Sequence, residues 1–256
     1  MSAPDSIDTP SLLLTWIETP WDTAIMGAPV LQIGHIELRG AGAVADFAEF
    51  EATRDALGAC LVSCRLPHDH LRESMFLESR GFRFIEMAYA PELDRLSARD
   101  LPEGGLEVAR ATADDLPAAL AIAEHAFRSE RFHVDPRLDP ALGDLRYCNW
   151  VRSSLDHPSQ RLFLVRDGTL PVAFFVTEML ADGTCYWHLN AVSPQVQGRD
   201  YGRRAWISML RQAREAGAAR VRTSIVARNY RVLNLYARLG FSFPAPLMTF
   251  HWARPA

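Results

Sequence analysis

The stretch Ala191–Trp206, "AVSPQVQGRDYGRRAW", joins the end of an apolar strand to the beginning of a helix. Backbone N–H groups at a helix start have no intrahelical partners, and they lie at the positive end of the helix dipole. Gly198 and Gly202 would let a bulky anion approach this backbone closely. Nearby positive charge comes from Arg199, Arg203 and Arg204. The stretch therefore predicts an anion site, although an ordinary turn with solvated arginines has the same composition.

Composition restricts the class of protein to which the chain can belong. Its 256 residues are enough for one large domain or two small ones, and the net charge of -4 gives no overall basic field for nucleic acid or anionic lipid. The longest apolar runs are far shorter than the roughly 20 residues of a membrane span. The N-terminal "MSAPDSIDTP" lacks the basic region of a signal peptide. We expect a cytoplasmic protein that binds neither membrane nor nucleic acid.

The four cysteines are scattered along the sequence. Cys60, Cys64, Cys148 and Cys185 fit neither a disulfide framework nor the spacing of a zinc site. We therefore expect reduced thiols and no metal.

Hydrophobic periodicity and Gly or Pro punctuation predict alternating strands and helices. In the first part we expect strands at 30–38, 59–67 and 82–93, and helices at 44–58 and 68–81. Arg95–Gly105 is charged and rich in Pro and Gly, so it is the predicted linker between an N-terminal domain, 1–100, and a second domain, 101–256. In the second part we expect helices at 112–127, 142–155, 202–216 and 229–240. The expected strands are 106–111, 161–179 (a hairpin), 184–192, 219–226 and 247–252. An irregular loop is expected at 129–140.

An internal similarity relates the two parts. A shift of 159 residues aligns Gly58 with Gly217 and Gly81 with Gly240, without gaps. At the position of Tyr236 the first copy has Leu77, so chemistry that needs this hydroxyl would belong to the second copy alone. Duplication and a chance likeness of two strand–helix–Gly units both remain open.

Two motifs in the second part resemble the signatures of the GCN5-related N-acetyltransferase (GNAT) superfamily. Gln197 and Gly202 occupy the first and last positions of its Gln/Arg-x-x-Gly-x-Gly/Ala motif. Asn229, Tyr236 and then Gly240-Phe241 resemble its second signature. The resemblance implies an α/β (α+β) GNAT fold, with a mixed, mostly antiparallel sheet flanked by helices, and a smaller N-terminal GNAT-like part.

The resemblance also implies transfer of an acetyl group from acetyl-CoA to an amine. The backbone N–H near Val192 would bind the thioester carbonyl, and Tyr236 would act as the general acid that protonates the leaving thiolate. Asn229 is either a cofactor contact or a plain helix N-cap. The implied cofactor-binding residues are Val192, Gln197, Gly198, Arg199, Tyr201, Gly202, Arg203 and Asn229.

A narrower similarity concerns the acceptor. The segments "LTWIETPWDTAIMG" and "AFRSERFHVDP…LRYCNWVRSSL" are similar to bacterial dTDP-fucosamine acetyltransferases, which acetylate the 4-amino group of a dTDP-linked deoxysugar. The candidate substrate-binding residues are Arg131, His133, Tyr147 and His188. Candidates for the base that deprotonates the amine are His133, His188 and Glu178, each of which is also an ordinary structural residue type.

Asp200 departs from the family pattern, which usually has Gly at this position. A carboxylate beside a diphosphate is unfavourable unless it turns outward and pairs with an arginine such as Arg199 or Arg204. Several alternatives therefore remain: another acyl thioester, an acyl carrier protein as donor, a different amine, or a non-catalytic GNAT-fold binding protein. A homodimer is also compatible with the sequence.

Overall fold

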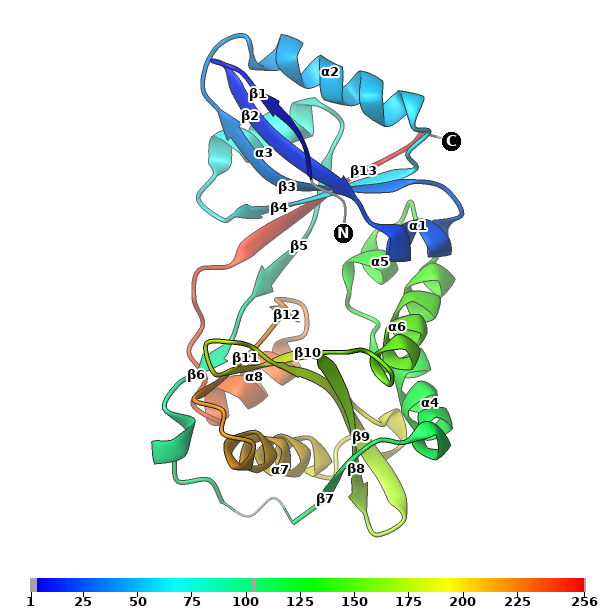
Figure 1. Ribbon diagram of the computed structural model, residues 1–256, viewed down its shortest axis with the longest axis vertical. Helices are drawn as coiled ribbons and strands as arrows, with labels where there is room; N and C mark the ends of the chain where they lie inside the picture. The colour runs from blue at the N-terminus through cyan, green and yellow to red at the C-terminus, as the bar shows by residue number, and fades with distance from the viewer. Residues whose placement is uncertain (1–3, 103–104, 256) are drawn as a thin grey trace.

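The computed structural model describes residues 4–102 and 105–255, which form two sheets that lie one above the other (Figure 1). In the first sheet the strand order is β1-β2-β3-β4-β13-β5-β12, and in the second it is β6-β11-β10-β9-β8-β7. The first sheet consists of β1 (Asp5–Asp8), β2 (Leu12–Glu18), β3 (Val30–Leu38), β4 (Leu61–Pro67), β5 (Arg83–Tyr89), β12 (Ile225–Val226) and β13 (Leu247–Ala253). The second consists of β6 (Glu92–Leu93), β7 (Glu107–Arg110), β8 (Gln160–Asp167), β9 (Leu170–Met179), β10 (Thr184–Val192) and β11 (Arg220–Thr223).

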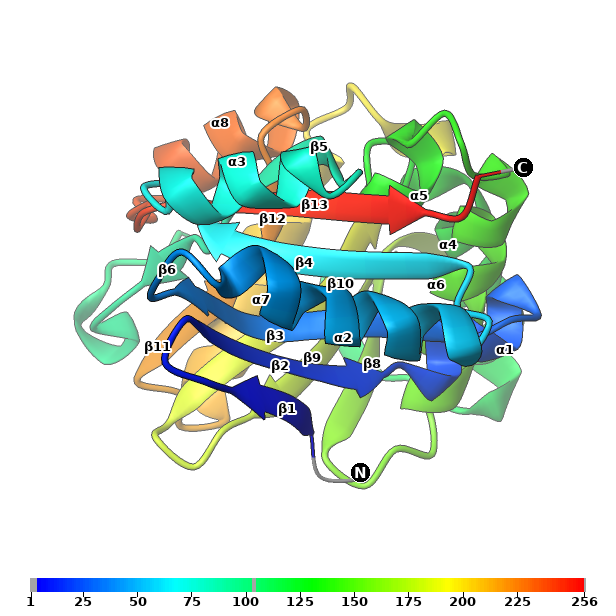
Figure 2. The ribbon, with the colours of Figure 1, turned by 90° about the horizontal axis from the view of Figure 1, so that it is seen from above.

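Helices cover both sheets. They are α1 (Pro20–Met26), α2 (Ala43–Ala56), α3 (Leu71–Ser79), α4 (Leu116–Ala126), α5 (Arg131–Val134), α6 (Pro140–Ser154), α7 (Tyr201–Glu215) and α8 (Tyr230–Arg238). Viewed from above, α2 and α3 lie across the outer face of the first sheet (Figure 2). The mixed, mostly antiparallel α/β architecture expected from the sequence is confirmed.

Two local expectations were wrong. The segment 129–140, expected to be an irregular loop, contains α5, a short helix with a buried Phe132. The strand expected at 219–226 divides at Ser224. Its first part, β11, pairs with β10, whereas its second part, β12, pairs with β5 in the other sheet.

The first part of the chain supplies a strand to the second sheet, and the second part supplies strands to the first sheet. β13, near the C-terminus, lies between β4 and β5, so Thr249 is opposite both Arg65 and Glu86. Conversely, β6 pairs with β11, and its Glu92 also bridges to Ser242. The division at residue 100 remains a prediction, but these exchanged strands cross it in both directions.

The inserted strand β13 alternates strictly between two environments. Met248 and Phe250 are buried in the core beneath α2 and α3, together with Phe47 and Phe50 of α2. Successive side chains of a strand point to opposite faces, so Thr249 and His251 point away from that core. The inner face of the first sheet, which faces the second sheet, therefore carries polar side chains next to the apolar Val30 and Leu61.

The repeat positions adopt the same local conformation in both parts. Gly58, Gly81, Gly217 and Gly240 have φ angles of 70°, 86°, 87° and 83°, the left-handed region that glycine tolerates best. Each follows a helix and lets the chain turn into the next segment. At the position that differs, Leu77 and Tyr236 are both fully buried, each in the core of its own sheet.

Buried ion pairs join the two parts. Asp22 of α1 accepts a hydrogen bond of 2.6 Å from Arg146 Nε and lies 3.7 Å from an Arg131 guanidinium nitrogen. Nearby, His251 Nδ1 of β13 lies 2.9 Å from Asp135 Oδ2. Burial lowers the pKa of His251 to about 4, so the neutral ring donates to the Asp135 carboxylate at neutral pH.

Residues 4–102 and 105–255 contain no helix that is both long and apolar enough to span a membrane. The four cysteines are free thiols. Burial raises the pKa of Cys64 to about 12 and that of Cys185 to about 11, so their reactive thiolate forms are scarce at neutral pH.

The exchanged strand predicts where the fold is most sensitive. Phe250 is 2 % exposed, and Phe250→Ala should lower the free energy of unfolding by about 3–5 kcal/mol, since it removes a ring from a packed core. Met75→Ala, at a side chain that is 69 % exposed, is the control and should change this free energy by less than about 0.5 kcal/mol. Urea unfolding followed by tryptophan fluorescence measures both. Equal effects would contradict the assignment of β13 to the core.

Candidate active site between the two sheets

The cleft begins where two neighbouring strands separate. β10 and β11 run parallel and pair from Thr184 and Arg220 to Trp187 and Thr223. β10 then continues alongside β9, after an irregularity at His188, whereas the chain after Thr223 leaves for the first sheet. A cleft of about 1340 Å³ extends from this gap and is lined by residues of both sheets.

The cleft has three chemically distinct walls. On β10, the cleft is lined by Tyr186 and then by every residue of the final segment His188–Val192. The polar face of the first sheet contributes Gln32, Arg65 and Glu86. The turn before α7 contributes Gln197, Gly198 and Asp200, and the first turn of α7 contributes Gly202 and Arg203. The start of a helix thus opens onto a cleft that contains both hydrophobic and charged side chains.

Asp200 adopts a conformation that explains why Gly is usual at this position. Its φ angle is 61°, in the left-handed region that Asp tolerates better than most residues other than Gly. The carboxylate accepts hydrogen bonds of 3.0 Å from Arg203 Nε and 2.7 Å from Arg203 Nη2. Its partner is therefore Arg203 rather than Arg199 or Arg204, the partners considered from the sequence. Because the Asp200 side chain is 52 % exposed, water screens this pair.

Most of the residues implied as cofactor-binding line the cleft. They are Val192, Gln197, Gly198, Gly202, Arg203 and Asn229. Arg199 is exposed and lies outside the lining. Tyr201 also lies outside it, and its hydroxyl donates a 2.9 Å hydrogen bond to Asp167 at the end of β8. Asn229 has N-cap geometry: its Oδ1 accepts from the Val232 N–H at 3.4 Å.

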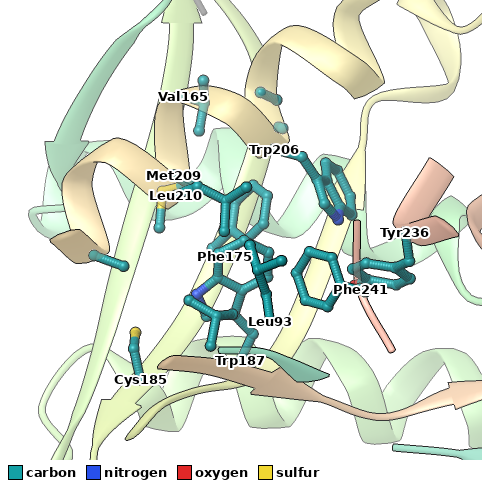
Figure 3. Close-up of a cluster of buried hydrophobic side chains, with 14 of the residues drawn as sticks. Leu93, Val165, Phe175, Cys185, Trp187, Trp206, Met209, Leu210, Tyr236 and Phe241 are labelled. Carbon is teal, nitrogen blue, oxygen red and sulfur yellow. The ribbon is translucent and has the colours of Figure 1, made fainter. Parts of the chain in front are cut away.

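Tyr236 lies behind the cleft wall rather than on it. The ring is fully buried between Trp206 and Phe241 (Figure 3). Its hydroxyl donates a 3.3 Å hydrogen bond to Oδ1 of Asn190, which does line the cleft. Burial raises the pKa of Tyr236 to about 12, so the phenol is protonated throughout the neutral range.

Asn190 also connects the separating strands. Its amide nitrogen donates to Thr223 Oγ1 at 3.4 Å, and Thr223 Oγ1 donates to the Trp187 carbonyl at 2.9 Å. The chain of hydrogen bonds from Tyr236 to Trp187 therefore spans the base of the gap and links α8, β10 and β11.

Three of the four candidate substrate residues line the cleft: Arg131, Tyr147 and His188. His133 does not; its Nε2 lies 3.0 Å from Asp144 Oδ1, and its ring stacks on Tyr147. The ring fits there because position 143 is glycine, where an added Cβ would meet it at 2.5 Å. These contacts describe a packed structural histidine.

His188 forms a polar pair at the cleft. Its Nε2 lies 2.8 Å from Glu178 Oε2, so two of the candidate bases are in direct contact. Hydrogen bonds from Ser159 and His188 lower the pKa of Glu178. Glu178 therefore stays ionised and orients the imidazole beside the cleft.

The first sheet contributes charged side chains to the cleft that were not among the predicted site residues. Arg65 and Glu86 line it, as do Trp21 of α1 and Glu130 before α5. A signal was present, because "LVSCRL" and "FIEMA" each carry a charge in the interior of an otherwise largely apolar strand. Such a charge is costly to bury in a core, so it marks a face that borders a polar space.

Comparison with known proteins connects this geometry to a family. Residues 120–241 match the family model described as Acetyltransferase (GNAT) family. This segment, just under half of the chain, is similar to GNAT acetyltransferase domains. The expected GNAT fold is confirmed, and the similarity indicates an acyltransferase.

Solved structures extend the fold similarity over nearly the whole chain. A GCN5-related N-acetyltransferase from Kribbella flavida is 16% identical with a TM-score of 0.63, covering 99% of this chain and 91% of the other. One from Sphaerobacter thermophilus is 14% identical with a TM-score of 0.66, covering 96% and 78%. A tandem GNAT protein from the clavulanic acid biosynthesis pathway is 14% identical with a TM-score of 0.58, covering 96% and 80%. At these identities the likeness concerns the fold. Comparison with curated proteins gives no match.

The burial of Tyr236 predicts a pH dependence of stability. Its pKa is raised from 10.0 to about 12, so its contribution is complete below pH 10 and is lost as the pH rises to 12, because the unfolded state ionises first. Tyr236→Phe should therefore flatten the decline of unfolding free energy between pH 10 and 12. The exposed Tyr230 provides the control variant, Tyr230→Phe, which should keep the decline. Urea unfolding at a series of pH values tests this, and parallel curves for wild type and Tyr236→Phe would refute it.

Proposed function

We propose that this protein transfers an acetyl group from acetyl-CoA to a primary amine that binds in the cleft. One observation carries the proposal: β10 and β11 separate beside the start of α7, within a segment that matches the GNAT family. A thioester arm laid in this gap would have its diphosphate at the helix start, where N–H groups and the dipole favour an anion. Gln197, Gly198, Gly202 and Arg203 would contact the diphosphate, and Asn229 would lie beside the coenzyme.

The chemistry is direct transfer from sulfur to nitrogen. The neutral amine attacks the thioester carbonyl, the carbon–nitrogen bond forms, and the carbon–sulfur bond breaks. Charge that develops on the carbonyl oxygen would be stabilised by the backbone N–H of Val192. The amine nitrogen loses a proton. The proposed acceptor is the pair formed by His188 and Glu178 at the cleft wall.

Tyr236 is the proposed source of the proton for the leaving thiolate. Its high pKa supports this role, because the hydroxyl is fully protonated at neutral pH. Its hydroxyl donates to Asn190 in this structure. The role therefore requires that the Tyr236 hydroxyl donates to the sulfur instead of to Asn190 when the thioester binds.

The acceptor proposed from the narrower similarity is an amino sugar linked to a nucleotide. Arginines and aromatic rings suit such a molecule, because guanidinium groups bind phosphate and flat rings stack on a base. Arg131, Tyr147 and Trp150 line the cleft, and the Arg146 guanidinium lies 5.4 Å from the centre of the Trp150 ring. A different amine or acyl thioester remains an outcome of the test below.

Thiol release from acetyl-CoA tests the proposed activity directly. We expect release with at least one member of a panel of dTDP-amino sugars and simpler amines. Tyr236→Phe should lower kcat by about 100-fold or more while the Kd for acetyl-CoA stays nearly constant, because it removes a general acid and not a binding group. Stabilisation by acetyl-CoA without turnover of any amine would instead indicate a non-catalytic binding protein. An unchanged kcat would remove Tyr236 from the mechanism.

The pair between Asp200 and Arg203 predicts how coenzyme affinity can be changed. Asp200→Gly removes one negative charge and frees Arg203 for the diphosphate, so acetyl-CoA should bind about fivefold tighter, equivalent to roughly 1 kcal/mol. Asp200→Asn keeps a residue that tolerates a positive φ and should give a similar gain, which separates charge from backbone freedom. Calorimetric titration at two salt concentrations measures both variants. Unchanged affinity would mean that the diphosphate does not reach Arg203.

A further inference from the structure

Glu86 is a charged residue that the proposed chemistry does not use. It lies on β5, is 2 % exposed and lines the cleft. Neither carboxylate oxygen has a hydrogen-bond partner among the described residues. Burial raises the pKa of Glu86, whereas the charge of Arg65 and the backbone N–H of Arg131 act in the opposite direction. Buried polar groups are normally paired, so each exception requires an explanation, such as a missing ligand.

Arg65 lies in the same row of the sheet. Thr249 of the central strand β13 is opposite Arg65 on one side and Glu86 on the other. Adjacent strands are about 4.8 Å apart, so the two backbone positions are separated by roughly 10 Å. The side chains face the same cleft and do not form an ion pair, which leaves room between a cation and an anion for a bound molecule.

The other charges around Glu86 do not neutralise it by direct contact. Arg131 and Arg146 both pair with Asp22, and Arg228 donates a 2.8 Å hydrogen bond to the Ile85 carbonyl. A second carboxylate, Glu130, also lines the cleft, and burial together with the charge of Glu86 raises its pKa to about 7. A cationic group of a bound molecule would supply the counterion that Glu86 lacks in direct contact among the described residues.

The row faces the reacting end of the cleft. Tyr186, on the cleft side of β10, is close enough to Arg65 for the guanidinium charge to affect its pKa, although burial dominates and raises that pKa. Two residues further along β10, His188 also lines the cleft. On the other side, β5 pairs with β12, which directly follows the separation of β10 from β11. A molecule held by Arg65 and Glu86 thus lies opposite the strand that would hold the thioester.

We propose that the inner face of the first sheet is the acceptor subsite, where Glu86 binds the ammonium group of the acceptor and Arg65 binds an anionic group of the same molecule. The acceptor is therefore an amine that also carries a carboxylate or a phosphate. This inference rests on the proposed acetyl transfer, because that reaction makes the bound molecule an acceptor. The binding of such a molecule can nevertheless be measured without turnover.

The pairing of opposite charges argues against simpler ligands. An uncharged amine derivative would leave Arg65 without a counterion and Glu86 without a cation. A plain anion would be attracted by Arg65 but repelled by Glu86 and Glu130. A zwitterion pairs with both Arg65 and Glu86 at once. A ligand with only one of the two charges leaves either Arg65 or Glu86 unpaired, and this difference gives selectivity.

Calorimetric titration of the full chain with matched small molecules tests the subsite. The phosphate set is glucosamine 6-phosphate, glucosamine and glucose 6-phosphate; the carboxylate set is β-alanine, propylamine and propionate. We expect the molecule with both groups to bind at least about tenfold tighter than either partner in one of the two sets. The set that shows this preference identifies phosphate or carboxylate as the anionic group.

Single substitutions then assign each end of the row. Glu86→Gln, which keeps the shape, should weaken the preferred molecule by about tenfold but should not weaken its amine-free partner, because the repulsion between Glu86 and the anion is removed. Arg65→Gln should weaken the preferred molecule similarly but should not weaken its anion-free partner, because the repulsion between Arg65 and the amine is removed. The controls are Glu78→Gln and Arg72→Gln, at exposed positions of α3. Thermal unfolding of each variant checks that it folds.

The outcomes separate this inference from the proposed function. No preference for the doubly charged molecule in either set, or unchanged binding in Glu86→Gln, would overturn the subsite. Acetyl-CoA titrated in parallel reports on the donor site. If the wild-type protein does not bind acetyl-CoA, the proposed acetyl transfer is refuted, whereas the result for the subsite still stands.

Discussion

The separation of β10 from β11 is the constraint on which the rest of the molecule depends. Parallel neighbours in a sheet ordinarily share hydrogen bonds along their length, and here that sharing stops at Trp187 and Thr223. The side chains of Asn190 and Thr223 supply polar partners at this point, so the base of the gap is bridged by hydrogen bonds. Because the gap lies inside a sheet and not in a loop, its width is fixed by rigid elements, as a site that positions two reactants requires.

The second wall of the cleft has the same rigidity for a different reason. Its charged side chains project from β4 and β5, strands that the inserted β13 joins into one sheet. The buried contacts of Asp22 with Arg131 and Arg146 then fix the first sheet against the helices of the second part. Buried ion pairs often add little net stability, since desolvation offsets their attraction. Here their importance is geometric, because they set the distance between the two walls.

Sequence patterns predicted the elements better than their partners. The helix at 44–58 and the strand at 30–38 followed from local periodicity and correspond to α2 and β3. Local patterns could not reveal that 219–226 serves two sheets, because the alternating residues of β11 and the apolar pair of β12 both fit one continuous extended strand. At the site, the turn before α7 carried a motif with a physical meaning, whereas Glu86 resembled an isolated acid in a strand. Its importance arises from contacts between residues distant in sequence.

The exchange of strands also constrains how the chain acquires its structure. β4 and β5 emerge early in synthesis, yet the strand that fills the space between them, β13, follows almost all of the second segment. Until it arrives, both strands expose unpaired edges, which are templates for association with other chains. Native pairing here has a large sequence separation, so it is slow to form. During biosynthesis the first sheet is consequently completed only after nearly the whole chain has been made.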